Sequence, residues 1–262
     1  MADDLDERLR RMVNSSGFPL QIAIKHLVET SSGNQKWTVM TEEHPWTNQI
    51  SGESGFIDLI LLHEWRTQVL VIECKRVRDS QWIFLVPSSN PTEFTYAKSW
   101  TTYSPKWLGW LDWHLGPASF GSSFCVVPGQ DGKAKPMLER TASSLVEATE
   151  AFAMEEYYLG VPGEGHLRTY FSVIVTTADL KTCRFDPNQI DVASGEIAKC
   201  EFEDVSLIRF RKSLIARNEE TSSKDIAEIL REKERTVFVV NSACFLDFLQ
   251  RWELGREPSV LR

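Results

Sequence analysis

The sequence predicts an α/β protein in which helices flank a mixed β-sheet, and three observations support this class. Residues 56–62 and 68–75 are apolar runs joined by a short polar turn, which is typical of an antiparallel hairpin. Residues 141–159 carry apolar side chains at helical spacing, and an apolar strand pattern follows at 170–176. A hairpin, a crossover helix and a further strand in this order are typical of α/β folds.

The other elements follow from the same signals of periodicity, turns and helix starts. In chain order they are a charged helix at 2–13, a helix at 19–30 with Pro19 in its first turn, a strand at 36–42, a helix at 106–115, short antiparallel strands within 180–212, a helix at 223–233, a strand at 236–241 and a helix at 243–253. We expect one domain over residues 1–262, which is long enough to bury a substantial core. Its parts are a core at about 17–78 and 141–177, an insertion at about 79–135 and a C-terminal β/α elaboration at about 180–262.

Composition narrows the class of protein. Hydrophobic residues make up 42% and charged residues 25%, as in ordinary globular proteins, and the formal net charge is −8. This charge excludes a global basic field for nucleic acid, although a local basic strip stays compatible with phosphate binding. Five scattered cysteines without a CxxC pair indicate reduced thiols and a cytoplasmic protein. No apolar run approaches about 18 residues, so no membrane partner is expected.

Three charges lie on the otherwise apolar hairpin, and its geometry brings them together. If residues 64–67 form the turn, Asp58 faces Glu73 directly across the two strands. Opposed side chains lie about 4.5–5.5 Å apart at Cβ, and Lys75 shares the face of Glu73. Two carboxylates against one ammonium leave a deficit of positive charge that a divalent cation would fill. A salt-bridged cluster with a purely structural role is the alternative.

Mg²⁺ suits such a site because it takes oxygen ligands and keeps several waters for a phosphate substrate. Lys75 would then hold the attacking water or stabilise charge on the phosphate. The acid-x-Lys tripeptide itself carries little information, because it recurs as Asp131/Lys133 and Asp179/Lys181. Only the copy at Glu73 has an acid at the start of the preceding strand, in register across a tight turn.

At these residues the chain resembles the PD-(D/E)xK nuclease superfamily, which has the restriction-endonuclease-like fold. The family signature is an Asp at the start of one strand and Glu-x-Lys at the end of the next. Here these are Asp58 and Glu73-Cys74-Lys75, and Ile57 stands where the signature has proline. The family core of helix, three strands, helix and strand matches residues 17–76 well and residues 141–176 more loosely.

The resemblance implies a nuclease that uses Mg²⁺, with Mn²⁺ as a substitute, to hydrolyse phosphodiester bonds, mostly in DNA. It implies that Asp58, Glu73 and the Cys74 carbonyl bind the metal and that Lys75 is the catalytic lysine. Many members carry a further acid on the first helix, where this chain has Gln21, an amide that could order a metal-bound water. Other candidates for that acid are Glu29, Glu43 and Glu53.

Two basic groups could contact phosphates or could be solvated strand edges. They are Arg76 with Arg78, directly after the proposed site, and Arg209 with Arg211 and Lys212. The insertion also carries four tryptophans that could stack on bases or pack in the core, namely Trp100, Trp107, Trp110 and Trp113.

The sequence therefore predicts a metal-dependent endonuclease acting on DNA, with RNA still open as a substrate. It is compatible with a monomer or a homodimer. The alternative is a restriction-like module without catalysis that binds nucleic acid or a protein partner.

Overall fold

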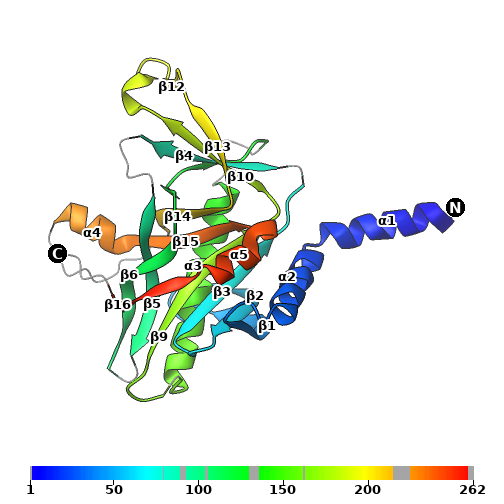
Figure 1. Ribbon diagram of the computed structural model, residues 1–262, viewed down its shortest axis with the longest axis vertical. Coiled ribbons are helices and arrows are strands. Elements are labelled where there is room, and N and C mark those ends of the chain that lie inside the picture. Colours follow the sequence, from blue (N-terminus) through cyan, green and yellow to red (C-terminus); the bar gives the residue numbers. More distant parts are fainter. Residues whose placement is uncertain are drawn as a thin grey trace.

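The computed structural model describes residues 2–78, 80–88, 93–103, 106–129, 136–161, 163–214 and 225–258. Over these residues the chain is an α/β protein with a mixed sheet and helices on both sheet faces, as the sequence predicts (Figure 1). Its helices are α1 (Ala2–Ser15), α2 (Phe18–Thr30), α3 (Met137–Tyr158), α4 (Ile226–Lys233) and α5 (Phe245–Gln250), with the short 3₁₀ turns η1 (Pro187–Gln189) and η2 (Ser242–Cys244).

The main sheet begins with the predicted hairpin and its neighbours. Along its main path the strands are β1 (Trp37–Thr47), β2 (Ser54–His63), β3 (Gln68–Lys75), β9 (Leu167–Thr176), β15 (Glu234–Asn241), β14 (Leu207–Ser213) and β7 (Gly121–Ser122). Strands β1, β2 and β3 are antiparallel neighbours, and β9, which follows α3, pairs parallel to β3. A crossover helix therefore connects the hairpin to a parallel strand, as expected.

The predicted insertion contributes strands to the same sheet. Strand β5 (Phe94–Tyr103) pairs with β9 over Leu167–Tyr170, while β15 pairs with β9 further along. Strand β6 (Trp107–Ser119) pairs with β5 and with β16 (Glu253–Pro258). The helix predicted at 106–115 is therefore wrong, and the helix predicted at 243–253 ends at Gln250 because β16 follows it.

A second sheet joins the insertion to the C-terminal part of the chain. It consists of β4 (Gln81–Pro87), β8 (Cys125–Val126), β10 (Asp179–Phe185) and β13 (Glu201–Val205), and a small third sheet pairs β11 (Ile190–Asp191) with β12 (Glu196–Ile197). Strands β4 and β10 pair in parallel, so the two segments that the sequence separates share one layer. The Asp131/Lys133 tripeptide lies outside the described residues.

Two apolar clusters hold the main sheet between helices. The cluster under α3 includes Ile60, Val71 and Phe152, and the cluster on the opposite face, under α2 and α5, includes Leu61 and Ile24. Both faces of β2 and β3 are thus buried, which explains why these strands are almost uninterrupted apolar runs. No described helix combines the length and the apolarity that crossing a bilayer requires.

Candidate functional site

The register of the hairpin agrees with the prediction. The β2–β3 ladder pairs Leu62 with Val69 and continues to Leu59 with Ile72. One further step along both strands opposes Asp58 and Glu73. The two carboxylates therefore lie at the end of the ladder, at the edge where β2 and β3 separate.

Asp58 bridges this separation with its own side chain. Pairing between β2 and β3 stops at Leu59, whereas β3 stays paired with β9 as far as Lys75 opposite Thr176. Asp58 Oδ2 accepts a hydrogen bond of 2.6 Å from the backbone N–H of Cys74. One carboxylate oxygen thus takes the place of a strand partner, and the other oxygen remains for a ligand.

A third carboxylate lies opposite Asp58 on the other neighbouring strand. The pairs Glu42–Leu59 and His44–Ile57 flank it, so Glu43 of β1 faces Asp58. Glu43 has a left-handed backbone with φ of 49°, which is uncommon for a residue with a side chain. The first three strands therefore carry a row of acids at one level, and of the three candidates for the additional acid it is Glu43 that lies here.

Gln21 fastens α2 to this row. Its side chain is 6% exposed, and its Nε2 donates to Glu43 Oε1 at 2.6 Å and to the Asp58 backbone carbonyl at 3.0 Å. The expected position of Gln21 beside the acids is therefore correct. Its amide contacts the side chain of one acid and the backbone of another, so it fixes the distance between helix and strands.

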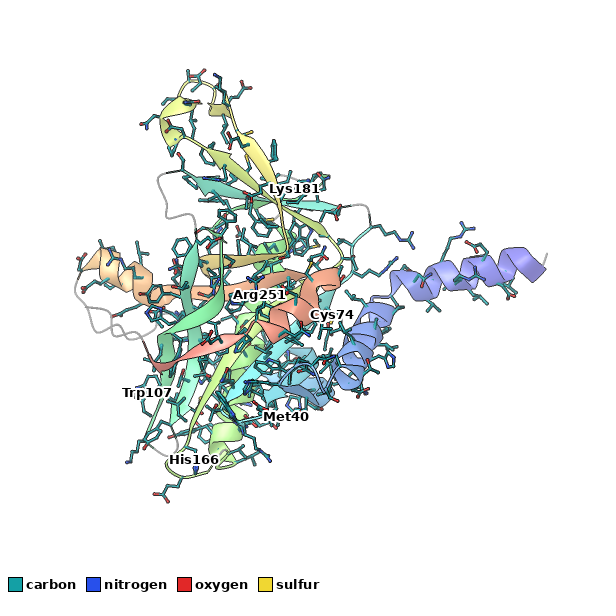
Figure 2. All side chains as sticks on the ribbon, viewed as in Figure 1. Met40, Cys74, Trp107, His166, Lys181 and Arg251 are labelled. Atoms are coloured by element: carbon teal, nitrogen blue, oxygen red, sulfur yellow. The ribbon has the colours of Figure 1, made fainter. Side chains whose placement is uncertain are left out.

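Gln21 and two of the three acids line a common cavity of about 290 Å³, whereas Glu43 lies outside its lining. Gln21, Asp58, Glu73 and Lys75 line it, together with Arg76 and with residues 15–18 at the junction of α1 and α2. Figure 2 shows Cys74 beside this junction. Residues 15–18 were not predicted to take part, because nothing in the α1–α2 linker indicates which strands it will meet.

The carboxylates lie in an environment that disfavours their ionised forms, mainly because they are partly buried. Burial, and next the neighbouring Asp58, raises the pKa of Glu73 from 4.5 to about 7, although Lys75 opposes the rise. Burial also raises the pKa of Asp58; the Cys74 N–H opposes this and Glu43 adds to it. The carboxylates are therefore harder to ionise together than they would be in water.

The donor set fits a Mg²⁺ ion bound mainly through water. Within the described part of the chain, no three His, Cys, Asp or Glu side chains form a ready ligand cluster. Mg²⁺ is commonly held by one or two carboxylates and keeps several waters, which Asp58, Glu73 and the cavity can supply. Burial raises the pKa of the Cys74 thiol well above the usual range, and Mg²⁺ takes oxygen ligands in preference to a thiol.

The two basic groups have different surroundings. Arg76 lines the cavity, and Arg78 is exposed two residues further along the chain. Arg209, in contrast, is fully buried and donates to Ser119 Oγ and to the Leu115 carbonyl, each at 2.6 Å. The prediction that Arg209 contacts phosphate is therefore wrong, because its guanidinium is committed inside the fold.

Arg211 and Lys212 also have partners away from the site. They lie on β14, three strands beyond β3 in the sheet order. Arg211 Nε donates to Glu234 Oε1 at 2.8 Å, and Lys212 pairs with Glu139. The structure thus does not bring this second basic group to the acidic row.

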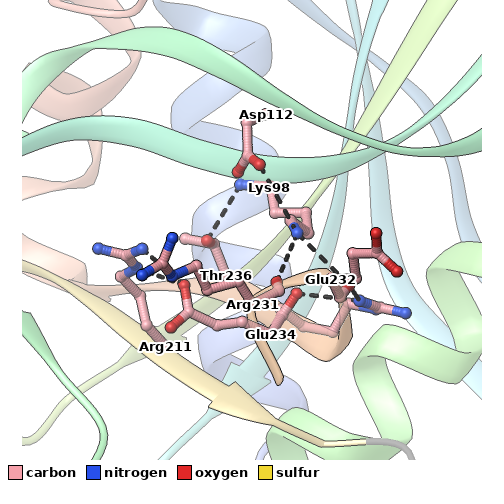
Figure 3. Close-up of polar contacts among 8 residues, drawn as sticks. Lys98, Asp112, Arg211, Arg231, Glu232, Glu234 and Thr236 are labelled. Atoms are coloured by element: carbon pink, nitrogen blue, oxygen red, sulfur yellow. Dashed lines mark hydrogen bonds and ion pairs between the residues drawn. The ribbon is translucent and has the colours of Figure 1, made fainter. Parts of the chain in front are cut away.

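A separate group of buried charges surrounds Lys98 of β5 (Figure 3). Lys98 Nζ donates to the Arg231 carbonyl at 2.7 Å and forms an ion pair of 3.6 Å with Asp112. Burial lowers the pKa of Lys98. Because the last carbonyls of a helix lack helical partners, these contacts give Lys98 a structural role in holding α4 against the sheet.

The four tryptophans of the insertion are mainly structural. Trp100 and Trp113 are 6% and 2% exposed, and Trp113 Nε1 donates to Thr101 Oγ1 at 3.1 Å. Trp110 packs edge-on against Trp100 at 5.2 Å. Of these four, Trp107 is the exposed one, so base stacking by the group is not supported.

The third acid-x-Lys copy provides a comparison. Asp179 and Lys181 lie on β10 of the second sheet, and Lys181 pairs with Asp204. Neither residue lines the cavity that holds Asp58 and Glu73. Compared with known proteins, the chain matches no family model, and neither a curated protein nor a solved structure matches it significantly.

Proposed function

We propose that this protein is a metal-dependent nuclease that hydrolyses phosphodiester bonds in DNA, built on a restriction-endonuclease-like core. The observation that carries the proposal is the meeting of Asp58 and Glu73 at the separated end of β2 and β3, in one cavity with Lys75. The order of α2, the β1–β3 meander, α3 and β9 along the chain also supports it. Burial and the neighbouring carboxylates raise the pKa of both Asp58 and Glu73 although Lys75 is close, which is the environment that a divalent cation would relieve.

Each residue then has a definite task. Asp58 and Glu73 hold Mg²⁺, which, when bound, polarises the phosphate and lowers the pKa of a coordinated water. The Cys74 carbonyl is the third ligand that we propose. Lys75 holds the attacking water in line or donates to the phosphate oxygens as their negative charge grows. Gln21 keeps Glu43 and the Asp58 backbone at fixed separation, so it positions the acids without touching the substrate.

Arg76 and Arg78 supply the nearest phosphate contacts. They follow Lys75 directly, and Arg76 lines the cavity itself. Cations that follow a phosphate backbone dominate nucleic-acid affinity and make it dependent on salt. We therefore expect replacement of Arg78, which is exposed and outside the cavity, to weaken binding more than it slows bond cleavage.

The test is a cleavage assay with matched variants. Supercoiled plasmid, linear duplex, single-stranded DNA and RNA are each incubated with Mg²⁺, with Mn²⁺ and with a chelator. The site variants are Asp58→Asn, Glu73→Gln and Lys75→Met, which keep side-chain size. The control variants are Asp179→Asn and Lys181→Met, which alter the same tripeptide outside the cavity.

Cleavage that needs the metal, disappears in all three site variants and persists in both controls supports the proposal. Cleavage of RNA and not of DNA would mean that the substrate is RNA, and the proposed roles of the metal and the site residues would stand. Metal-independent binding of DNA without cleavage would instead support the non-catalytic module. Loss of cleavage in the control variants to the same degree would overturn the assignment of the site.

A further inference from the structure

Helix α1 is a protruding element whose apolar face has no partner among the residues that the structure describes. It extends away from the body of the molecule and packs mainly against α2 (Figure 1). Four apolar side chains on α1 are between 48% and 61% exposed, namely Leu5, Leu9, Met12 and Val13. Their spacing of four and then three residues places them along one side of the helix.

Helix α2 also carries exposed apolar side chains. Within its first two turns α2 adds Phe18 and Ile22, which are 59% and 64% exposed. Scattered single apolar residues need no explanation, but a stripe of exposed apolar residues along one helix, as on α1, commonly marks an interaction site. This stripe lies on the segment that leads into the acidic cavity, because residues 15–18 line that cavity.

The charges of α1 indicate which partner fits. The first half of the helix is acidic and the second half is basic, with Asp3, Asp4, Asp6 and Glu7 followed by Arg8, Arg10 and Arg11. This distribution also suits the helix dipole, which needs no partner and leaves the apolar stripe unexplained. A second copy of the same helix, running antiparallel, covers the stripe and sets each acidic half beside a basic half.

We propose that α1 is a dimerisation element through which two copies of this chain associate in antiparallel orientation. A two-fold interface of this kind is self-complementary, as closed dimers require. A helix of 14 residues is about 21 Å long, so the contact is small. We expect a dissociation constant on the order of micromolar, at the weak end for specific interfaces. The proposal does not depend on nuclease activity.

The first test measures the oligomeric state of the full chain. Sedimentation velocity over a range of about 1 to 200 μM, which brackets a micromolar constant, should show a shift from monomer to dimer. The double variant Leu9→Gln and Met12→Gln should stay monomeric over that range. The control Leu230→Gln removes an exposed leucine from α4, 56% exposed, and should dimerise as the wild type does.

A charge exchange identifies the partner as a second copy. In one variant Arg8, Arg10 and Arg11 become glutamate, and in the other Asp3, Asp4, Asp6 and Glu7 become lysine. Each variant alone should remain monomeric, because like charges would meet along the pair, and an equimolar mixture should restore a dimer. Circular dichroism confirms that every variant is folded.

Two results would overturn the proposal. One is a wild-type chain that is monomeric over the whole concentration range. The other is a dimer that the α1 variants leave unchanged, which would place the interface elsewhere. A wild-type dimer, monomeric charge variants and a dimer in their mixture together would establish it.

Discussion

Replacing Glu73 by glutamine is expected to make the folded protein more stable above neutral pH while it abolishes metal binding. Burial and the neighbouring Asp58 raise the pKa of Glu73 from 4.5 to about 7. The carboxyl group therefore holds its proton more tightly in the folded chain than in the unfolded chain. Glutamine resembles the protonated side chain in size and cannot ionise, so the variant keeps the neutral state at every pH.

The size of the effect follows from the pKa values. Each pKa unit corresponds to about 1.4 kcal/mol, so the difference between 4.5 and about 7 amounts to about 3 kcal/mol. With a raised folded-state pKa, the stabilisation is complete below pH 4.5 and is lost as the pH rises to about 7. The free energy of unfolding of the wild type should fall over this window, and that of Glu73→Gln should fall by about 3 kcal/mol less.

Urea unfolding in the presence of a chelator, at several pH values across this window, measures the difference. The same series with Mg²⁺ should stabilise the wild type at high pH and leave Glu73→Gln unchanged, because a ligand stabilises only the state that binds it. Parallel pH profiles of the two proteins, or a variant that is the less stable one at high pH, would refute the assignment of Glu73 as a strained carboxylate.

Other substitutions test the assigned roles. Gln21→Leu should cost about 1–3 kcal/mol in urea unfolding, because the buried amide makes two part-buried hydrogen bonds, to the Glu43 carboxylate and to the Asp58 carbonyl, and both are lost; Glu29→Gln, at the exposed end of the same helix, should cost little. Arg209→Met should lower the free energy of unfolding by about 2 kcal/mol or more and leave DNA affinity per folded molecule unchanged; weaker DNA binding at full stability would contradict its structural role. Trp113→Ala should cost about 3–5 kcal/mol, and Trp107→Ala clearly less; equal costs by thermal unfolding would contradict their different burial.

The sequence was informative where the structure is local. The hairpin closes over a turn of a few residues, so the register that opposes Asp58 to Glu73 follows from the alternation and the turn alone. Glu43 could not be assigned in this way. The β1–β2 register shifts between Val39 and Thr41, and such an irregularity moves every later residue of β1 to the other face.

The insertion shows why longer-range pairing escapes the sequence. Trp107, Trp110 and Trp113 recur every three residues, which predicts a helix. The segment is instead a strand, because its backbone pairs with β5 on one side and with β16 on the other. Aromatic residues favour strands in such pairings. The burial of Arg209 was unpredictable for a similar reason, because its hydrogen-bond partners come from β6, about ninety residues earlier in the chain.

The hydrogen bond from Cys74 to Asp58 affects how any mutagenesis of this protein must be interpreted. The Asp58 carboxylate links β2 to β3 beyond the last pair of their ladder, and it also offers an oxygen to a ligand. Asp58→Ala removes the link between the strands and the metal ligand together. Lost cleavage could then result from altered spacing of β2 and β3 as well as from a missing metal. In Asp58→Asn the side-chain oxygen can still accept a hydrogen bond from the Cys74 N–H, while the negative charge is lost. This variant therefore tests the role in metal binding separately from the role in linking the strands.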